Sequence, residues 1–297
     1  MFKSFLIFLF STVFYIHTFS QSHFYTVDTI REVRIYFYDS DWDSLLDSFY
    51  VAGDNERILA DIIIDGLSYD SVGVRYKGFS SVSVNRIKNP FNIKLDYIID
   101  DQDHQGIDKI KLSNVIQDPS FIREVLSYEI VRKYMPASQA NFTNVFINDT
   151  LWGLYTNVEA VNKSFLIDQF DNKYNTFIKC NPENLNIQIG AENANLSNTH
   201  GTDSTNYEPY YSMKSDNGWT DLYNLIDTLN NFTDSIEEVL NVDRTLWMHA
   251  INYSLINFDS YIGYGQNYYL YKDITRQFNP IIWDLNMSFG GFRLTDA

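Results

Sequence analysis

The residues best suited to chemistry lie near the end of the sequence, where two acids and an amide surround short apolar segments. Asp259 follows a predicted helix, Asn267 comes shortly after it, and Asp284 begins a turn after an apolar strand. A carboxylate can accept a hydroxyl proton, and carboxylate and amide oxygens are hard ligands that suit Mg²⁺. Phosphoryl transfer needs such a set, with Asp259 as the proton acceptor and Asn267 and Asp284 as metal ligands. Asp and Asn are also common in ordinary turns, so a structural role stays open.

A basic turn with glycine and serine is a second candidate. Segment 74–81 follows a predicted strand and contains Arg75, Lys77 and Ser80. Backbone N–H groups of such a turn, together with Lys77, could contact phosphates. Gly73, just before this segment, and Gly78 within it have the spacing of a phosphate loop, but the Lys-Ser/Thr pair of that motif does not follow. An ordinary hairpin turn with solvated charges is the alternative.

Lys94 and Glu129 are predicted to pair. Lys94 lies in the apolar strand 91–95, and Glu129 falls on the predicted apolar face of the next helix. Because buried charges need partners, we expect the two to meet, as a strand lysine and a helix glutamate do in protein kinases. The alternative is that Lys94 faces solvent and Glu129 meets an unrelated arginine.

Strands and one helix must position the first half of these residues. Period-two patterns predict strands at 33–38, 60–64, 72–77, 91–95 and 145–158, with a tight turn at 148–150 and a short helix at 42–49. A further helix is predicted between Asp118 as N-cap and Pro136, with an apolar face of Phe121, Ile122, Val125 and Leu126.

The second half is predicted to be mainly helical. Residues 181–218 are rich in Asn, Ser, Thr and Gly and indicate a loop insertion, and helical patterns follow at 220–229, 234–240 and 244–258. We therefore expect an α+β protein with a divergent two-lobed, kinase-like fold. A strand-rich lobe would span 22–160 with one inserted helix, and a helical lobe, expected to be truncated, would span 161–297.

Composition and the N-terminal segment restrict the partners and the compartment. Residues 1–21 have the charged, apolar and polar regions of a signal peptide, so we expect a secreted or surface protein with no membrane span after cleavage; an uncleaved anchor is the alternative. The net charge of −16 disfavours nucleic acid as a partner. With Cys180 as the single cysteine, no intrachain disulfide can form.

The sequence resembles the CotH family of atypical secreted or surface protein kinases, related to spore-coat proteins. The matching segments are VGVRYKGFSS, NPFNIKLD, IDKIKLSN, DPSFIREVLSYEIVRKY, LWGLYTNVEAVNKSFL, NYYLY and IIWDLNMSFGG. The resemblance implies ATP with Mg²⁺ or Mn²⁺ as cofactors and protein Ser/Thr hydroxyls as acceptors. It also implies that Asp259 is the catalytic aspartate and that Asp284 is the metal-binding one. Glu159 is a candidate ATP-binding residue in the region that links the lobes.

Two departures from the family pattern concern the metal. Gln266 stands where a histidine often precedes the NYYLY asparagine, and Asn286 stands where an aspartate is common. Weaker charge there would lower metal affinity or shift it toward Mn²⁺. A catalytically weak or inactive surface adhesin with a kinase fold is the main alternative function, and a structural coat component is a third.

Overall fold

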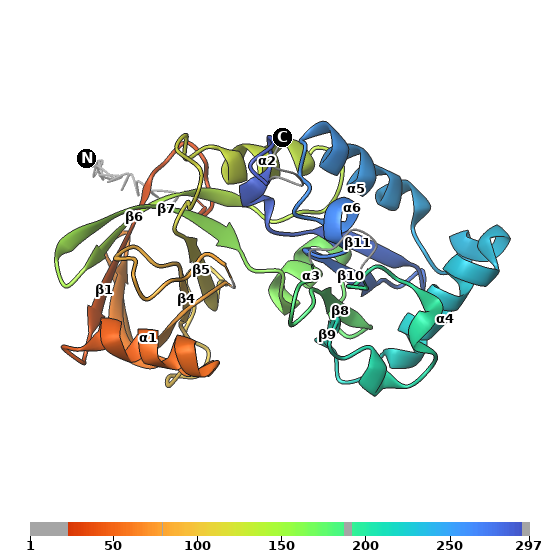
Figure 1. The fold of residues 1–297 in the computed structure, drawn as a ribbon. Coiled ribbons are helices and arrows are strands. Elements are labelled where there is room, and N and C mark those ends of the chain that lie inside the picture. The colour runs from red at the N-terminus through yellow and green to blue at the C-terminus, as the bar shows by residue number, and fades with distance from the viewer. Residues whose placement is uncertain (1–22, 79, 187–191, 293–297) are drawn as a thin grey trace, which may run out of the picture.

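The computed structural model describes residues 23–78, 80–186 and 192–292. The expected signal peptide lies outside these residues. The chain forms a seven-stranded closed barrel that stands beside a four-stranded sheet with its helices (Figure 1). The α+β prediction is therefore confirmed.

The barrel forms because its strands alternate between side chains that point inward and outward. In β1, Val33 and Ile35 are fully buried between partly exposed neighbours. The strand order is β1-β2-β3-β4-β5-β7-β6, and a parallel pairing of β1 with β6 closes the barrel. The strands are β1 (Arg31–Phe37), β2 (Ile58–Ile64), β3 (Leu67–Tyr76), β4 (Phe91–Lys94), β5 (Lys109–Ser113), β6 (Ala140–Ile147) and β7 (Thr150–Glu159).

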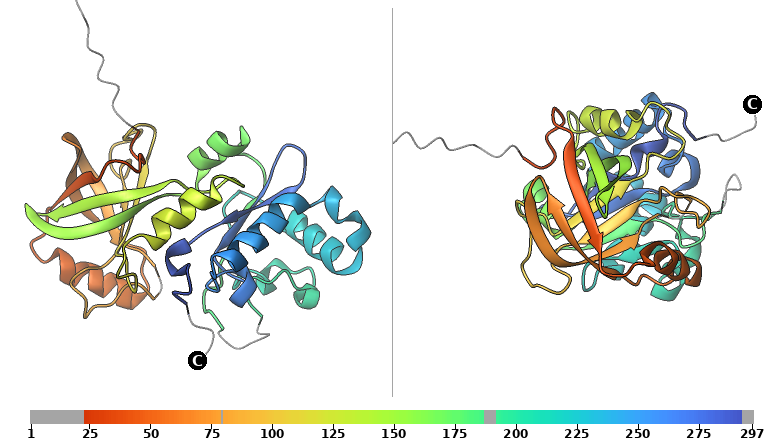
Figure 2. Two further views of the ribbon diagram at one scale, coloured as in Figure 1. Left: turned by 90° about the horizontal axis from the view of Figure 1, so that it is seen from above. Right: turned by 90° about the vertical axis from the view of Figure 1, so that its left-hand side faces the viewer.

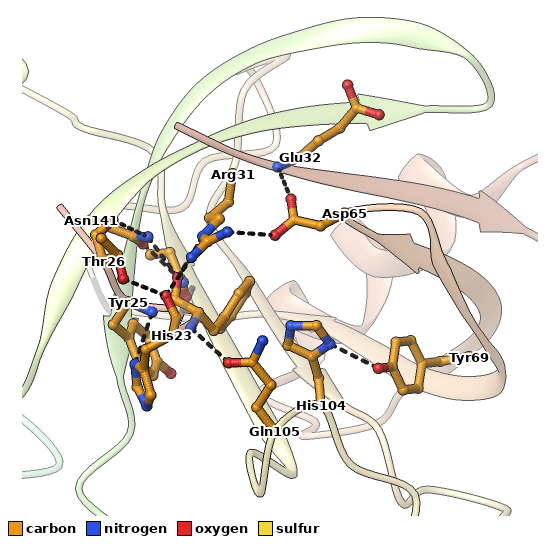
Figure 3. A network of polar contacts seen from close by, with 12 residues as sticks. His23, Tyr25, Thr26, Arg31, Glu32, Asp65, Tyr69, His104, Gln105 and Asn141 are labelled. Atoms are coloured by element: carbon orange, nitrogen blue, oxygen red, sulfur yellow. Dashed lines mark hydrogen bonds and ion pairs between the residues drawn. The ribbon is translucent and has the colours of Figure 1, made fainter. Parts of the chain in front are cut away.

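The segment before β1 closes one end of the barrel (Figure 3). The Phe24 carbonyl accepts hydrogen bonds from Arg31 Nε at 3.0 Å and Asn141 Nδ2 at 2.7 Å. The Phe24 N–H donates to Gln105 Oε1 at 2.8 Å. Arg31 also pairs with Asp65 at 3.1 Å. These bonds satisfy polar groups that would otherwise be buried without partners at the barrel end.

The second sheet has the order β11-β10-β8-β9. Its strands are β8 (Phe177–Cys180), β9 (Tyr211–Met213), β10 (Tyr268–Lys272) and β11 (Phe278–Ile282). The helices of the chain are α1 (Trp42–Ala52), α2 (Arg123–Val131), α3 (Lys163–Phe170), α4 (Trp219–Asn231), α5 (Val242–Ser254) and α6 (Tyr261–Tyr264), and short 3₁₀ helices are η1 (Asn198–His200), η2 (Ser204–Asn206), η3 (Thr233–Glu238) and η4 (Leu285–Met287).

Helix α2 belongs in sequence to the strand-rich half but packs with the other half. Val125, Tyr128 and Val131 share one apolar cluster with residues of β8, β10 and β11. The barrel has its own cluster, which includes Val33 and Ile35. The helix between β5 and β6 therefore ties the barrel to the second sheet.

The predicted bounds and buried face of this helix were wrong. The helix begins at Arg123 instead of Pro119, because Phe121 has a left-handed φ of 63° and the Asp118 carboxylate accepts the Arg123 N–H at 2.9 Å. The rotation of the helix exposes Leu126 and buries Glu124.

Other predicted elements compare more closely with the structure. The short helix at 42–49 is confirmed as α1, and Asn148 and Asp149 form the predicted turn with φ of 45° and 66°. The predicted loop insertion at 181–218 contains η1, η2 and β9, and it buries Tyr207 and Tyr211 in the second core. Within the described part of the chain, no helix combines the length and apolar character that a bilayer crossing needs.

Candidate active site

The β10–β11 hairpin brings Asn267 and Asp284 to the same end of the second sheet. Tyr268 pairs with Ile282, so the residues just outside the hairpin face each other, and the Trp283 N–H donates to the Asn267 carbonyl at 3.1 Å. Both Asn267 and Asp284 have left-handed backbones, with φ of 58° and 60°. Such conformations are uncommon for residues with a side chain and concentrate at functional sites.

Asp259 lies beside this hairpin. Gln266 Nε2 donates to Asp259 Oδ1, and Asn267 Nδ2 donates to the Asp259 carbonyl at 2.9 Å. Burial, and then the charge of Asp284, raise the pKa of Asp259 to about 7, although the Gln266 hydrogen bond acts in the opposite direction. The structure thus brings together the three acid and amide residues predicted from the sequence.

Helix α2 contacts the same place through its buried face. The Tyr128 hydroxyl accepts a hydrogen bond from the Asp284 N–H at 3.2 Å, and α2 packs against η4, which follows Asp284. One turn earlier, Glu124 is 6% exposed. Burial raises the pKa of Glu124 to about 7; the charge of Lys77 lowers it, and the charge of Asp284 raises it.

Three lysines from different strands or strand ends lie near one another beside Asp284: the charge of Asp284 acts on Lys111 and Lys179, and the charge of Lys77 acts on both of these lysines. Lys77 follows β3 and donates to Ser113 Oγ at 2.9 Å, and Lys111 on β5 lies over the Trp283 ring at 4.3 Å from its centroid. Lys179 lies on β8. Burial first, then the charges of Lys77 and Lys179, hold the pKa of Lys111 well below its usual range, and the charge of Asp284 opposes this.

The pKa of Lys179, which lies on β8 in the other half of the molecule, is lowered as well. Burial lowers the pKa of Lys179, the charge of Asp284 raises it, and the charges of Lys214, Lys77 and Arg75 lower it further. Its position follows from strand alternation, because its neighbours Ile178 and Cys180 are both fully buried.

The same alternation positions Lys111. Ile110 and Leu112 fill the barrel core, so Lys109, Lys111 and Ser113 lie on the outer face of β5. Ser113 also hydrogen-bonds to Glu124, so its hydroxyl connects the Lys77 ammonium to the helix carboxyl.

We call Lys77, Lys111, Lys179, Glu124 and Asp284 the lysine–aspartate cluster. Among the described residues, the Asp284 carboxylate takes part in no ion pair or hydrogen bond, and none of the three lysines forms an ion pair. Unpaired cations that depress one another's pKa are stabilised by a bound anion. The cluster is therefore suited to an anionic ligand with several charges.

The oxygens of Asn267 and Asp284 fit a hard divalent cation. The Asn267 amide N–H₂ contacts Asp259, and its oxygen accepts no hydrogen bond from any described residue. Carboxylate and amide oxygens are ligands that Mg²⁺ and Mn²⁺ accept. No group of three or more His, Cys, Asp or Glu suited to a metal occurs in the described ranges. Two protein oxygens would leave the other positions to water and phosphate, as is usual for Mg²⁺.

The predicted pairing of Lys94 with Glu129 was wrong. Lys94 is the last residue of β4, and its Nζ lies 3.8 Å from Asp96 Oδ1. Glu129 Oε1 pairs with Arg132 Nη1 at 3.0 Å. All four side chains are between 30% and 38% exposed. The helix rotation that buries Glu124 turns Glu129 toward the surface, so the alternative of an unrelated arginine partner is confirmed.

Of the remaining predicted residues, Lys77 and Arg75 lie in or near the cluster, and Ser80 and Glu159 do not belong to it. Lys77 belongs to the cluster, and Arg75 lies close enough for its charge to lower the pKa of Lys179. Ser80 is exposed. Glu159 lies away from the cluster, where its carboxylate accepts the Gln139 N–H at 2.9 Å.

The sequence analysis missed Lys111, Lys179, Ser113 and Glu124. A signal for Lys111 was present, because segment IDKIKLSN alternates apolar and polar residues as a half-buried strand does. Strand β8 is only four residues long, which made Lys179 hard to place.

Comparison with protein families identifies a match over most of the chain. The family model described as CotH kinase protein matches residues 74–295, which include every member of the lysine–aspartate cluster as well as Asp259 and Asn267. Among curated proteins, a search finds no match to the chain.

Proposed function

The chain belongs to the CotH kinase family, and from this premise we propose that it is a secreted atypical protein kinase. In this proposal it transfers the γ-phosphate of ATP to Ser/Thr hydroxyls of extracytoplasmic or surface proteins. The observation that carries the proposal is that, among the described residues, the Asp284 carboxylate is unpaired and the three lysines near it form no ion pair.

The order of elements supports a two-lobed, kinase-like arrangement. A strand carries Lys111, the next helix carries Glu124, and two antiparallel strands then lead to the second half. There a helix is followed by Asp259, Asn267, a hairpin and Asp284. Protein kinases use a strand lysine, a helix glutamate, and then an aspartate, an asparagine and a second aspartate in this order. Among the described residues of this chain, the helix glutamate, Glu124, interacts with Lys77 and not directly with Lys111. Ser113 contacts both Glu124 and Lys77, because its hydroxyl accepts a hydrogen bond from Lys77 and bonds to Glu124.

The lysines would bind the nucleotide phosphates. Lys77 and Lys111 come from the barrel and Lys179 from the second sheet, so a phosphate chain between them would join both halves. The positive charges of the three lysines repel one another, and a bound phosphate group would offset this repulsion by attracting each ammonium. Phosphoryl transfer depends mainly on such positioning and electrostatic stabilisation.

Asn267 and Asp284 would hold the divalent cation. Mg²⁺ or Mn²⁺, when bound, neutralises charge on the phosphate oxygens. The hydrogen bond from Asn267 to Asp259 fixes the amide, and the hydrogen bond from the Asp284 N–H to Tyr128 fixes the backbone at the other ligand.

Asp259 would act as the proton acceptor. As the acceptor hydroxyl oxygen forms its bond to the γ-phosphorus and the bond from that phosphorus to the ADP oxygen breaks, the hydroxyl proton passes to the Asp259 carboxylate. A base works best when its pKa lies near the working pH, and the pKa of Asp259 is raised to about 7. Gln266 orients the carboxylate through its hydrogen bond to Oδ1.

The test is transfer of labelled γ-phosphate from ATP, with Mg²⁺ or Mn²⁺, to the protein itself and to a serine-rich acceptor. We expect transfer by the wild type, loss in Asp284→Ala, and normal transfer in Asp216→Ala, which removes an exposed acid that lines no part of the cluster. If the wild type transfers no label and calorimetry detects no nucleotide binding, the kinase proposal fails and the adhesin alternative gains support.

A further inference from the structure

A second polar site lies at the junction between the barrel and the second half. It is a pocket of about 290 Å³ formed by the segment before β1, the turn that leads into β5, and the connection from β7 into α3. We call it the acidic junction pocket and define it by Tyr25, Asp108, Glu159 and Asp168.

The pocket is separate from the lysine–aspartate cluster. In the view from above, the red start of the described chain and green helix α3 lie on one side of the molecule, and the C-terminal end that follows Asp284 lies on the other (Figure 2). The charges that shift the pKa of Glu159 come from Asp168 and Arg132, not from members of the cluster. A ligand here would not occupy the proposed phosphate site.

The negative charge of the pocket is only partly offset by nearby cations, since the charge of Arg132 acts on Glu159 and Lys109 lines the pocket. Asp108 accepts a hydrogen bond from Asn162 Nδ2 at 3.0 Å, and Glu159 accepts one from the Gln139 N–H at 2.9 Å. Across the described ranges, none of the three carboxylates forms an ion pair, although Lys109 also lines the pocket. Burial, and then the charge of Asp168, raise the pKa of Glu159.

Tyr25 provides an independent sign that this pocket suits a polar ligand. Its side chain is 4% exposed, it lines the pocket, and its buried hydroxyl has no hydrogen-bond partner among the described residues. The hydroxyl lies close enough to Glu159 and Asp108 that, after burial, their charges raise the pKa of Tyr25. A buried hydroxyl without a partner is rare, and a phenol can both accept and donate a hydrogen bond.

We propose that the acidic junction pocket binds a guanidinium group. The three carboxylates come from separate elements and do not form a group suited to a metal ion within the described residues. A guanidinium has five N–H donors in a planar fork, so it can reach separated carboxylates and the Tyr25 oxygen at once. The pocket volume is at the small end for ligand sites and suits one arginine-sized molecule or side chain.

Binding would connect the two halves of the chain. Tyr25 and Asp108 belong to the barrel side, and Asp168 belongs to α3, so a ligand between them would restrain the junction that β7 and α3 share. The guanidinium could come from free arginine or from an arginine side chain of a protein.

Isothermal titration calorimetry of the full chain would test this proposal with L-arginine, L-citrulline and the peptide Gly-Arg-Gly. We expect L-arginine or the peptide to bind and citrulline, which has a similar shape but no charge, to show no binding. Stronger binding of the peptide would assign the site to protein arginines, and stronger binding of L-arginine would assign it to the free amino acid.

Three variants distinguish binding in this pocket from nonspecific attraction of a cation to the acidic protein. Asp168→Asn and Glu159→Gln should each weaken binding about tenfold, because each removes a charged acceptor, and Tyr25→Phe should weaken it several-fold. Asp171→Asn is the matched control, since Asp171 follows α3 directly but does not line the pocket. Equal binding of citrulline, absence of binding by both L-arginine and the peptide, or an equal loss in Asp171→Asn would each overturn the proposal. Because binding is measured without ATP, failure here leaves the kinase proposal untouched.

Discussion

The lysine–aspartate cluster and the acidic junction pocket both use strand β5, but their unmatched charges have opposite signs. On β5, Lys111 belongs to the cluster, whereas Lys109 and the preceding Asp108 line the pocket. The cluster gathers three lysines from three places in the chain, and the pocket gathers three carboxylates. Two sites that share a strand can therefore favour ligands of opposite charge.

Protein charge is normally paired when it leaves water, because desolvation of an isolated ion is unfavourable. In both regions the hydrogen bonds within the protein satisfy only part of the polar groups. The cluster therefore favours an anion with several charges, and the pocket favours an organic cation. Variants that affect one region and spare the other test this comparison.

The largest expected effect is that of Asp259→Asn on phosphate transfer. Loss of the proton acceptor should lower the turnover number by roughly 10²- to 10⁴-fold, while the affinity for ATP and the binding of arginine in the junction pocket stay near wild type. In the wild type, transfer should rise with pH through about 7, because Asp259 must lose its proton to act as a base. Steady-state kinetics from pH 5.5 to 8.5 provide the measurement.

Asp216→Asn is the control for that experiment. Asp216 is exposed, and the side-chain hydrogen bonds at Asp259 come from Gln266 and Asn267. A variant Asp259→Asn that keeps wild-type turnover would remove Asp259 from the mechanism and leave the role of the cluster to be judged separately.

Lys111→Met should show the next largest effect. Removal of one phosphate-binding cation should lower kcat/KM for ATP by roughly 10²- to 10³-fold. The matched variant is Lys109→Met, which removes the same charge two residues away on the same strand face. Lys109 lines the junction pocket, so its loss should change ATP kinetics only slightly. If both variants lose ATP turnover equally, the assignment of Lys111 to the phosphates is wrong.

Glu124→Gln should change how stability depends on pH. The folded-state pKa of Glu124 is raised from 4.5 to about 7, so its contribution is fully present below pH 4.5 and is lost as pH rises through about 7. This loss corresponds to roughly 3 kcal/mol of unfolding free energy, since a rise from 4.5 to about 7 is worth about 1.4 kcal/mol per pKa unit. Urea unfolding at pH 5, 6, 7 and 8 should show a smaller decline for the variant than for the wild type.

Asp259 adds a loss of the same sign, since its pKa is also raised, so the Glu124→Gln variant should keep part of the decline. Parallel stability curves for the wild type and Glu124→Gln would show that Glu124 titrates normally in the folded protein.

Tyr128→Phe should have the smallest effect of the four. It leaves the Asp284 N–H without its acceptor at the contact between α2 and η4. The expected cost is about 1 kcal/mol of unfolding free energy with a few-fold decrease in transfer. Tyr134→Phe is the control, since Tyr134 is 49% exposed and stacks on Trp247 outside the cluster. Equal activity of the two variants would mean that the tyrosine does not help to position Asp284.

Features set by neighbouring residues could be predicted from the sequence. Strand alternation indicated β1 to β4, and the turn between β6 and β7 followed from Asn148 and Asp149. Asp259, Asn267 and Asp284 were predicted as a set, and the structure places them together because a single hairpin with its preceding loop joins them.

The choice among similar charged residues could not be predicted in this way. Lys94 and Lys111 both lie on strands of alternating pattern, and Glu124 and Glu129 lie on one helix. The predicted residues, Lys94 and Glu129, are the more exposed members of these pairs. A helix that starts a few residues later turns a different face to the core, and a residue at the end of a strand escapes burial.

Local sequence patterns were enough to predict the α+β pattern of elements and the short-range order of an acid, an amide and an acid near the end of the sequence. The identity of the lysines near Asp284 depends on long-range packing, because barrel closure and the docking of α2 bring β3, β5 and β8 together across long separations in the chain. The junction pocket is likewise a tertiary feature, since Tyr25, Asp108 and Asp168 meet only when three distant segments fold against one another.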